Sequence, residues 1–273
     1  MKPVDLQSVR ALVREAAHAE LMPRFAEVAR HIKVDGSIVT EADHAMQDRI
    51  QRELVKLYPQ HRFIGEEMPA QELAAVTAVG DAPLWCLDPL DGTSNYSTGV
   101  PFFGVSLALL IGDLVEIGVV YDPIRDECFT AQRGRGAWLN ELPLSVSQGR
   151  HPTALERSIA GVDFKRLESS LAQRLAGAPP YGSQRNFGAC SLEWCWLADA
   201  RFHIYLHGGQ KLWDYAAGSL ILEEAGGLAV TLDGEPVFRR GLAPRSVVAA
   251  VDSALLGQWQ SCLSHTGAPP KNP

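Results

Sequence analysis

Two aspartates three residues apart, Asp88 and Asp91, form the pair in this sequence best suited to binding a metal ion. They stand in "WCLDPLDGTSNY" (residues 85–96), where an apolar segment ends, and no basic residue lies within five positions of the stretch. Like charges held close together repel each other, and burial raises the cost further. We therefore expect either that the two side chains point apart into water or that a cation lies between them.

The residues around the pair favour the cation. Pro89 fixes one backbone angle and Leu90 is apolar, so the predicted turn after the strand "PLWCLD" is stiff and only partly hydrated. A simple turn does not need a second aspartate followed by Gly-Thr. Hard divalent ions such as magnesium prefer carboxylate, carbonyl and water oxygens. Gly92 lets the backbone approach a ligand, and a helical turn starting at "TSNYS" would direct free N–H groups at a phosphate. The stretch thus predicts metal-dependent chemistry on a phosphate ester.

Carboxylates stand at the ends of predicted elements in three further places. They are Asp43, the pair Glu66–Glu67, and Asp214. Each has an explanation that needs no metal: Asp43 complements a helix dipole, Asp214 serves as a helix N-cap, and a Glu-Glu pair is usually solvated. For each residue taken alone, these alternatives stay open.

Composition and charge limit the class of protein. The 273 residues can form one large domain or two of ordinary size, and 46% hydrophobic with 21% charged residues is typical of a folded globular chain. A net charge of −7 argues against a general binder of nucleic acid or membrane surfaces. The longest apolar run, "VSLALLIG" from Val105, is too short to cross a bilayer, and the N-terminus lacks the apolar core of a signal peptide. Five cysteines without a CxxC pair predict reduced thiols in a cytoplasmic protein and no zinc site.

Hydrophobic periodicity predicts two halves that must position these residues. In the first half we expect helices over residues 5–31, from Thr40 to just before Pro59, and over 69–79, with β-rich runs between 104 and 131. In the second half, short strands alternate with helices near 165–175, 191–199, 214–225 and 253–264. We expect an α+β half at 1–145 that carries most of the metal ligands and an α/β half at 146–273 that completes the active site.

Four segments resemble, in order and spacing, the signatures of the inositol monophosphatase family. They are "DGSIVTEAD" at 35–43, "GEE" at 65–67, "DPLDGTSNY" at 88–96 and "WDYAAGSLILEEAGG" at 213–227. The resemblance covers essentially the whole chain. It implies a layered αβαβα sandwich of the inositol monophosphatase and sugar phosphatase type, commonly a homodimer, and a magnesium-dependent, often lithium-sensitive phosphomonoesterase.

The resemblance also implies which residues hold two or three Mg²⁺ ions. Glu66, Asp88 and the carbonyl of Leu90 would hold the first ion. Asp88, Asp91 and Asp214 would hold a second, so that Asp88 bridges the two. Two ions can neutralise both the attacking and the leaving oxygen, and no covalent intermediate is then required.

Catalytic roles follow from the same resemblance. Glu67 and Thr93 would position the attacking water and help to deprotonate it. Asp43 would support Thr93 or hold a water of the metal shell. The backbone N–H groups of Gly92 and Thr93 would bind the phosphate.

The side that would face the alcohol matches the family less closely. "RNFGACSLEW" (185–194) resembles the family's glycine-rich segment, so Gly188 and Ala189 would line the substrate site, whereas Cys190 is either a packed small hydrophobe or a pocket residue. His207 stands where the animal inositol enzymes place a glutamate that binds sugar hydroxyls. It can still hydrogen-bond a hydroxyl, but an exposed loop histidine is an equal alternative.

Three basic residues have two open interpretations each. Arg185 and Lys211 could meet a second anionic group of the substrate, although a solvated surface position is the simpler explanation. Lys33 either lies near the site in a loop or is a solvated helix end.

We therefore predict a magnesium-dependent phosphomonoesterase that hydrolyses a small phosphorylated alcohol, such as an inositol monophosphate or a sugar phosphate. The alternatives within this class are a 3′-phosphoadenosine 5′-phosphate nucleotidase and a sugar bisphosphatase. A different class is a protein partner of the transcription or ribosome-maturation machinery, because some bacterial relatives resemble phosphatases yet act there. We expect a cytoplasmic homodimer with no direct binding of nucleic acid or membranes.

Overall fold

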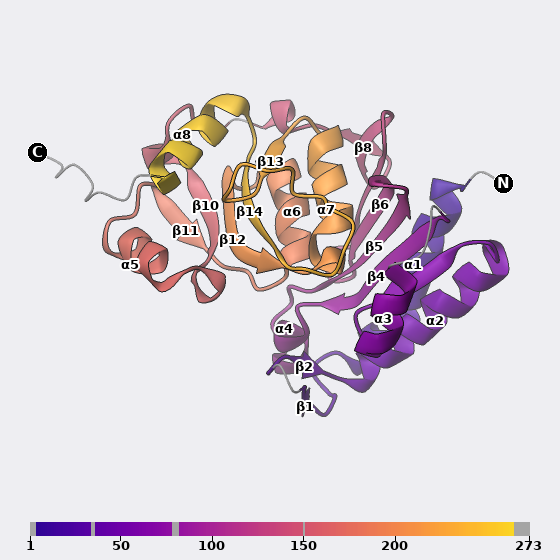
Figure 1. The fold of residues 1–273 in the computed structure, drawn as a ribbon. Coiled ribbons are helices and arrows are strands. Elements are labelled where there is room, and N and C mark those ends of the chain that lie inside the picture. The colour runs from indigo at the N-terminus through magenta and orange to yellow at the C-terminus, as the bar shows by residue number, and fades with distance from the viewer. Residues whose placement is uncertain (1–3, 34–35, 78–81, 150, 265–273) are drawn as a thin grey trace, which may run out of the picture.

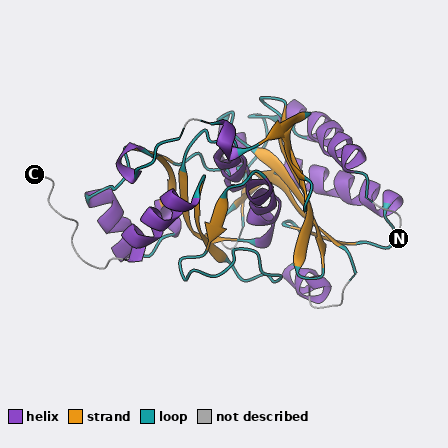
Figure 2. Cartoon of the chain, turned by 90° about the horizontal axis from the view of Figure 1, so that it is seen from above, coloured by secondary structure: helices purple, strands orange, loops and turns teal. Residues whose placement is uncertain are grey.

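The computed structural model describes residues 4–33, 36–77, 82–149 and 151–264, and its helices and sheets alternate in layers (Figure 1). The helices are α1 (Leu6–Glu20), α2 (Glu41–Leu57), α3 (Ala70–Thr77), α4 (Thr93–Thr98), α5 (Ser169–Gly177), α6 (Cys190–Ala198), α7 (Leu212–Glu224) and α8 (Ser253–Ser264). α1 and α2 form one outer layer, α6 and α7 lie between the two large sheets, and α8 packs on the far face of the second sheet. Figure 2 shows the middle helices flanked by strands on both sides. The predicted αβαβα order is confirmed.

The first large sheet has the order β3-β4-β5-β6-β7-β8-β9, and every pairing except the parallel β3–β4 pair is antiparallel. Its strands are β3 (Arg62–Gly65), β4 (Leu84–Asp91), β5 (Gly104–Ile111), β6 (Leu114–Asp122), β7 (Glu127–Gln132), β8 (Gly136–Leu139) and β9 (Leu142–Leu144). The β-rich runs predicted between residues 104 and 131 are therefore confirmed as antiparallel strands.

The second large sheet has the order β11-β10-β12-β14-β13, in which β10 pairs in parallel with both of its neighbours. Its strands are β10 (Ile159–Asp163), β11 (Ser183–Arg185), β12 (Ile204–Gln210), β13 (Leu228–Val230) and β14 (Arg245–Ala250). A separate hairpin pairs β1 (His31–Ile32) with β2 (Ile38–Val39).

Strand β5 shows why the apolar run from Val105 is continuous. Leu107 and Leu109 belong to the hydrophobic cluster beneath α1 and α2, whereas Ala108 and Leu110 belong to the cluster around α6 and α7. Successive side chains of a strand point to opposite faces of the sheet. Because both faces are buried, both sets of positions are apolar.

The prediction of one helix over residues 5–31 is wrong. α1 ends at Glu20, and a short 3₁₀ turn follows at Met22–Arg24 with Pro23 in its first positions. Proline has no backbone N–H to donate, and it disfavours the helical conformation of the preceding residue. The apolar periodicity of the first fifteen helical residues does not reveal this stop.

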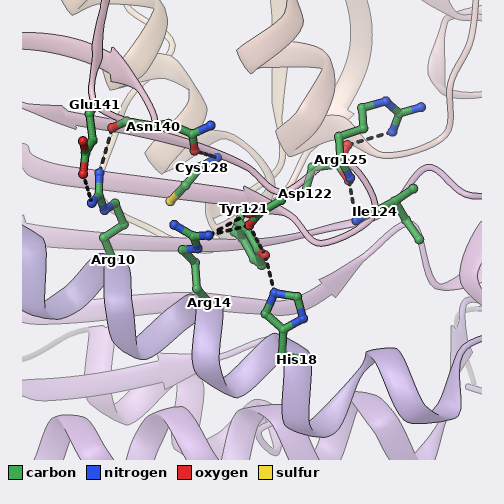
Figure 3. A network of polar contacts seen from close by, with 11 residues as sticks. Arg10, Arg14, His18, Tyr121, Asp122, Ile124, Arg125, Cys128, Asn140 and Glu141 are labelled. Carbon is green, nitrogen blue, oxygen red and sulfur yellow. Dashed lines mark hydrogen bonds and ion pairs between the residues drawn. The ribbon is translucent and has the colours of Figure 1, made fainter.

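Polar contacts attach α1 to the first sheet (Figure 3). The guanidinium of Arg14 donates to both carboxylate oxygens of Asp126, at 2.7 and 2.8 Å. The hydroxyl of Tyr121 on β6 donates to Asp126 Oδ1 at 2.7 Å and lies 2.8 Å from His18 Nε2. The partly exposed ion pair contributes about 0–1 kcal/mol, so the buried apolar face of α1 supplies most of the attachment.

The remaining helices match their predicted ranges with small shifts. α2 begins after the Thr40 cap as expected, and α3 accounts for the predicted helix at 69–79, whose end falls outside the described residues. α5 begins only at Ser169, since a 3₁₀ turn occupies Phe164–Arg166. Across the part of the chain that the structure describes, no helix combines the length and apolarity that a membrane span requires.

Candidate active site

Strand β4 continues through Asp91, so the prediction of a strand that ends at Asp88 is wrong. Its register against β5 shifts between Asp88, which pairs with Ser106, and Asp91, which pairs with Gly104. Such a shift marks a β-bulge. In a regular strand, residues three apart face opposite sides of the sheet. The bulge removes that constraint, and the backbone N–H of Leu90 donates to Asp88 Oδ1 at 3.0 Å within it.

Three of the predicted metal ligands converge. Glu66, Asp88 and Asp214 each offer a carboxylate oxygen, and these three atoms lie within 4.8 Å of one another. Glu66 follows β3, which runs parallel to β4, so both strands deliver their acids at the same edge of the sheet. All three donors are the hard oxygens that Mg²⁺ prefers, and this donor set therefore fits the ion. Asp91 is not part of this three-residue group.

Asp214 is held at the start of α7. The helix begins at Leu212 with Lys211 as its N-cap, so the interpretation of Asp214 as the N-cap is wrong. Asp214 is the third helical residue, and its Oδ2 accepts a hydrogen bond from the backbone N–H of Lys211 at 2.8 Å. The helix start thereby fixes the carboxylate toward the strand ends.

Burial and mutual repulsion disfavour the charged forms of these acids. Burial raises the pKa of Asp88 well above its usual range, and the charges of Glu66, Asp91 and Asp214 raise it further. The pKa of Asp214 is raised well above its usual range for the same reasons. Burial also raises the pKa of Glu66 to about 6, against the opposing effect of Lys33. A cation would relieve this repulsion.

Two residues of the outer helix α2 contact Thr93 and Glu67, the residues predicted to position the attacking water. Asp43 caps the helix by accepting from the backbone N–H of Thr40 at 2.8 Å, and its other oxygen accepts from Thr93 Oγ1 at 3.1 Å. One turn later, Gln47 Oε1 accepts from the backbone N–H of Glu67 at 3.0 Å. Residues four apart share one helix face. Asp43 therefore caps α2 with one carboxylate oxygen and contacts Thr93 with the other.

Two lysines contact the glutamate pair. Lys33 Nζ lies 2.6 Å from Glu67 Oε1 and 3.7 Å from Glu66 Oε1, and Lys211 Nζ lies 3.8 Å from Glu66 Oε1. Because the side chain of Glu67 is only 5% exposed, the interpretation of a solvated Glu-Glu pair is wrong. Lys33 follows β1 in a hairpin, so it is not a solvated helix end either. Both lysines add positive charge beside the acids.

His207 is buried in β12, with 3% of its surface exposed, so the interpretation as an exposed loop residue is wrong. Its Nδ1 accepts from the backbone N–H of Gly209 at 3.1 Å. The proton of the neutral ring therefore sits on Nε2, which lies 3.3 Å from Asp163 Oδ2 and 3.7 Å from Cys190 Sγ. Although burial opposes ionisation, the contact with His207 lowers the pKa of Asp163. A carboxylate thus stands beside His207.

The predicted substrate segment lies against the predicted phosphate turn. Gly92 has a φ of +87°, and a Cβ added there would come within 3.0 Å of the Ala189 side chain and 3.3 Å of the Gly188 carbonyl oxygen. Only glycine fits both this backbone conformation and this contact. Arg185 is exposed and donates to Ser183 Oγ in its own strand at 2.7 Å, which favours its solvated interpretation.

A sequence model of the inositol monophosphatase family matches residues 5–264. The chain belongs to the inositol monophosphatase family. It is 38% identical over 234 residues to the Haemophilus influenzae protein named Nus factor SuhB, covering 82% of this chain and 83% of that protein. It is 36% identical over 218 residues to inositol monophosphatase 1 of Solanum lycopersicum, covering 77% and 78%. The solved structure of a Thermotoga maritima IMPase has a TM-score of 0.81 at 25% identity, covering 96% and 97%.

Other residues at the site of this inositol monophosphatase family member were not predicted from the sequence. Besides Gln47, they include Ser191, whose backbone N–H and Oγ each donate to Asp91 Oδ2 at 2.6 Å, and Glu193, which is buried in α6. Asn95 Nδ2 donates to the carbonyl of Phe187 at 2.7 Å. A signal for Glu193 is present in the sequence: it is the single charged residue of "CSLEWCWLA". A charge within such an apolar helix needs buried partners.

The metal-free form of this family member is expected to lose stability as the pH rises. Folding raises the pKa of Glu66 from 4.5 to about 6, and that of Asp88 well above its usual range. Between these values the native state binds more protons than the unfolded chain, so the stabilisation present at lower pH is lost as the pH rises. Melting temperatures in chelator should fall from about pH 4.5 to 6 and beyond, relative to a series in excess magnesium. A metal-free series that rises relative to the magnesium series would contradict the carboxylate cluster.

Proposed function

We propose that this protein is a magnesium-dependent phosphomonoesterase that acts on a small phosphorylated alcohol. The convergence of Glu66, Asp88 and Asp214 beside the phosphate turn carries the proposal. These three acids, together with Asp91 and the carbonyl of Leu90, would hold the Mg²⁺ ions. When bound, magnesium supplies charge neutralisation at the phosphate and makes a nearby water more acidic.

The chain's own residues would place the water and the phosphate. Thr93, oriented by Asp43, and Glu67, oriented by Gln47, would hold the attacking water. One proton of this water would go either to the Glu67 carboxylate or to Thr93, which would pass its own hydroxyl proton to Asp43. The backbone N–H groups of Gly92 and Thr93 would bind phosphate oxygens. The water oxygen then forms a bond to phosphorus while the bond to the alcohol oxygen breaks. The leaving oxygen takes up a proton from solvent water, and the proton held by the base returns to solvent. No side chain needs to bond covalently to phosphorus.

A substrate panel tests this proposal. Phosphate release would be measured with magnesium for an inositol monophosphate, a sugar phosphate, a sugar bisphosphate and 3′-phosphoadenosine 5′-phosphate. We expect a monophosphate of a polyol to react fastest, and the variant Asp88→Asn to be inactive on every compound. Fastest release from the nucleotide would identify a nucleotidase instead, and no release from any of them would refute the phosphatase proposal.

The pair of His207 and Asp163 should affect the choice of alcohol. Asp163→Asn replaces the carboxylate beside His207, which is the expected acceptor of a hydrogen bond from a substrate hydroxyl, with a neutral amide. Because a hydrogen bond to a charged group is worth about 1.5–3 kcal/mol, kcat/KM for a polyol phosphate should fall about tenfold or more, with less than about twofold change for a simple aryl phosphate. Asp113→Asn, on the exposed β5–β6 turn, is the matched control. An unchanged ratio of the two rates would place Asp163 outside the pocket.

The relative named Nus factor SuhB favours a second candidate function, which is binding to a protein of the transcription machinery. Affinity capture from cell extract, performed with the wild type and with Asp88→Asn, would test it. Recovery of RNA polymerase subunits by both proteins would support a role that does not depend on the metal site. Their absence from both captures would reject this candidate.

A further inference from the structure

Glu193 is a buried acid with three hydrogen-bond donors. It lies on α6 with 3% of its surface exposed. Its Oε1 accepts from the backbone N–H of Phe187 at 2.8 Å and from that of Gly188 at 3.3 Å, and its Oε2 accepts from the hydroxyl of Tyr205 at 2.8 Å. Two of the three donors therefore belong to the segment Phe187–Ser191, which faces the phosphate turn. A buried carboxyl group is tolerated only with such partners.

A rigid network behind Glu193 fixes its orientation. The Tyr205 hydroxyl, which donates to Glu193, accepts from Gln210 Nε2 at 2.7 Å, and Gln210 Oε1 accepts from Trp194 Nε1 at 2.9 Å. All four side chains are buried, and they come from α6 and β12 in the interior. Fully satisfied buried networks of this kind restrict the side chains to one arrangement.

The segment Phe187–Ser191 is held from two sides. Asn95 on α4 donates to the carbonyl of Phe187 at 2.7 Å, while Glu193 accepts from the backbone of the same residue. Gly188 then takes a φ of +78°, and its carbonyl closely approaches Gly92. At the far end of the segment, Ser191 donates twice to Asp91 Oδ2. The segment thus joins the alcohol side of the site to a predicted metal ligand.

We propose that Glu193 is a positioning residue for substrate binding, which holds Phe187 and Gly188 so that the following residues face the bound phosphate ester. The proposal rests on the phosphatase function proposed above. Glu193 need not touch the substrate, because it acts through the backbone of the segment. An apolar side chain would fill its place in α6 equally well but would leave the N–H groups of Phe187 and Gly188 without their acceptor.

The test is Glu193→Met, which keeps the length of the side chain but removes both oxygens, so that the N–H groups of Phe187 and Gly188 lose their acceptor. We expect KM for the best substrate to rise about tenfold at saturating magnesium, with kcat within about threefold, because the segment loses its fixed position while the metal-binding acids are unchanged. Hydrogen exchange at the amides of Phe187 and Gly188 should accelerate.

Two further variants make the result specific. Tyr205→Phe removes one partner of Glu193 but keeps the oxygen that accepts from Phe187 and Gly188, so KM should rise by a smaller factor, and this variant also serves if Glu193→Met does not fold. Glu141→Gln alters an exposed acid on the β8–β9 turn and should leave KM unchanged. A lower melting temperature with unchanged KM and unchanged amide exchange would show a purely structural role and overturn the proposal.

Failure of the proposed function would give a distinguishable result. If the wild type hydrolyses no phosphate ester, that function is rejected, and titration of inorganic phosphate with magnesium still tests Glu193. The wild type should then bind phosphate at least about fivefold more tightly than Glu193→Met. Equal affinities, or no binding by either protein, would overturn the positioning role.

Discussion

Chelation of divalent ions is expected to abolish phosphate release, and magnesium should restore it. Glu66, Asp88 and Asp214 place carboxylate oxygens within 4.8 Å of one another, and Asp91 adds to their repulsion. Without a cation, burial and mutual repulsion raise the pKa values of these acids, and the site lacks the ion that would neutralise and orient a phosphate ester. The loss should therefore be complete within the sensitivity of a phosphate assay.

The assay would compare the protein after dialysis against chelator with the same sample after addition of magnesium or calcium. Calcium should fail to restore full turnover, because its larger and more flexible coordination shell suits a magnesium site poorly. Release that persists undiminished in excess chelator would exclude a metal-dependent reaction. Full activity with calcium would show that the site does not have the size that we infer.

Local signals in the sequence predicted most of the elements. The Thr40–Asp43 capping box marks the start of α2, and β-rich runs separated by Gly-Asp and Asp-Pro turns indicate the strands from Gly104 onward. The first helix was predicted too long because its apolar periodicity continues past Pro23, where proline has already ended it. For His207, a hydroxyl-binding role and an exposed loop position were equal alternatives, and the loop position is wrong because β12 continues through the next two glycines with a register shift. In both places the local sequence pattern does not show where the element ends.

The site was predictable only in part. The spacing of Asp88 and Asp91 predicts that they bind a metal ion, but no periodicity shows that Glu66 and Asp214 lie beside them. The family resemblance supplied that grouping. Gln47 and Glu193 were not found because their partners include backbone N–H groups, which lie 20 residues away in the chain for Gln47 and five and six residues away for Glu193. A backbone donor carries no sequence signature, so such contacts emerge only when the fold is known.

The substitution Asp91→Asn is expected to lower the rate by at least about a hundredfold, which corresponds to roughly 2.7 kcal/mol or more. Asparagine keeps the size and shape of the side chain but removes one negative charge from the proposed second metal site. If Asp91 only anchored the segment around Ser191, the amide oxygen of the asparagine would accept both hydrogen bonds that Asp91 Oδ2 now accepts, and turnover would change little. A large loss of rate in Asp91→Asn would therefore result from the lost charge, as expected of a metal ligand, and not from lost hydrogen bonds, as expected of an anchor.

Ser191→Ala provides the matched control for Asp91→Asn. It deletes the hydroxyl that donates to Asp91 while the carboxylate charge and the backbone N–H of residue 191 stay in place, so the rate should fall by less than about tenfold. In chelator, Asp91→Asn should melt at a higher temperature than the wild type, because the charge of Asp91 opposes ionisation of Glu66, Asp88 and Asp214. Phosphate release at saturating magnesium and thermal melts in chelator measure both effects. Near-normal turnover of Asp91→Asn, or a greater loss in Ser191→Ala, would mean that Asp91 orders the bulge and the segment beside it and holds no ion.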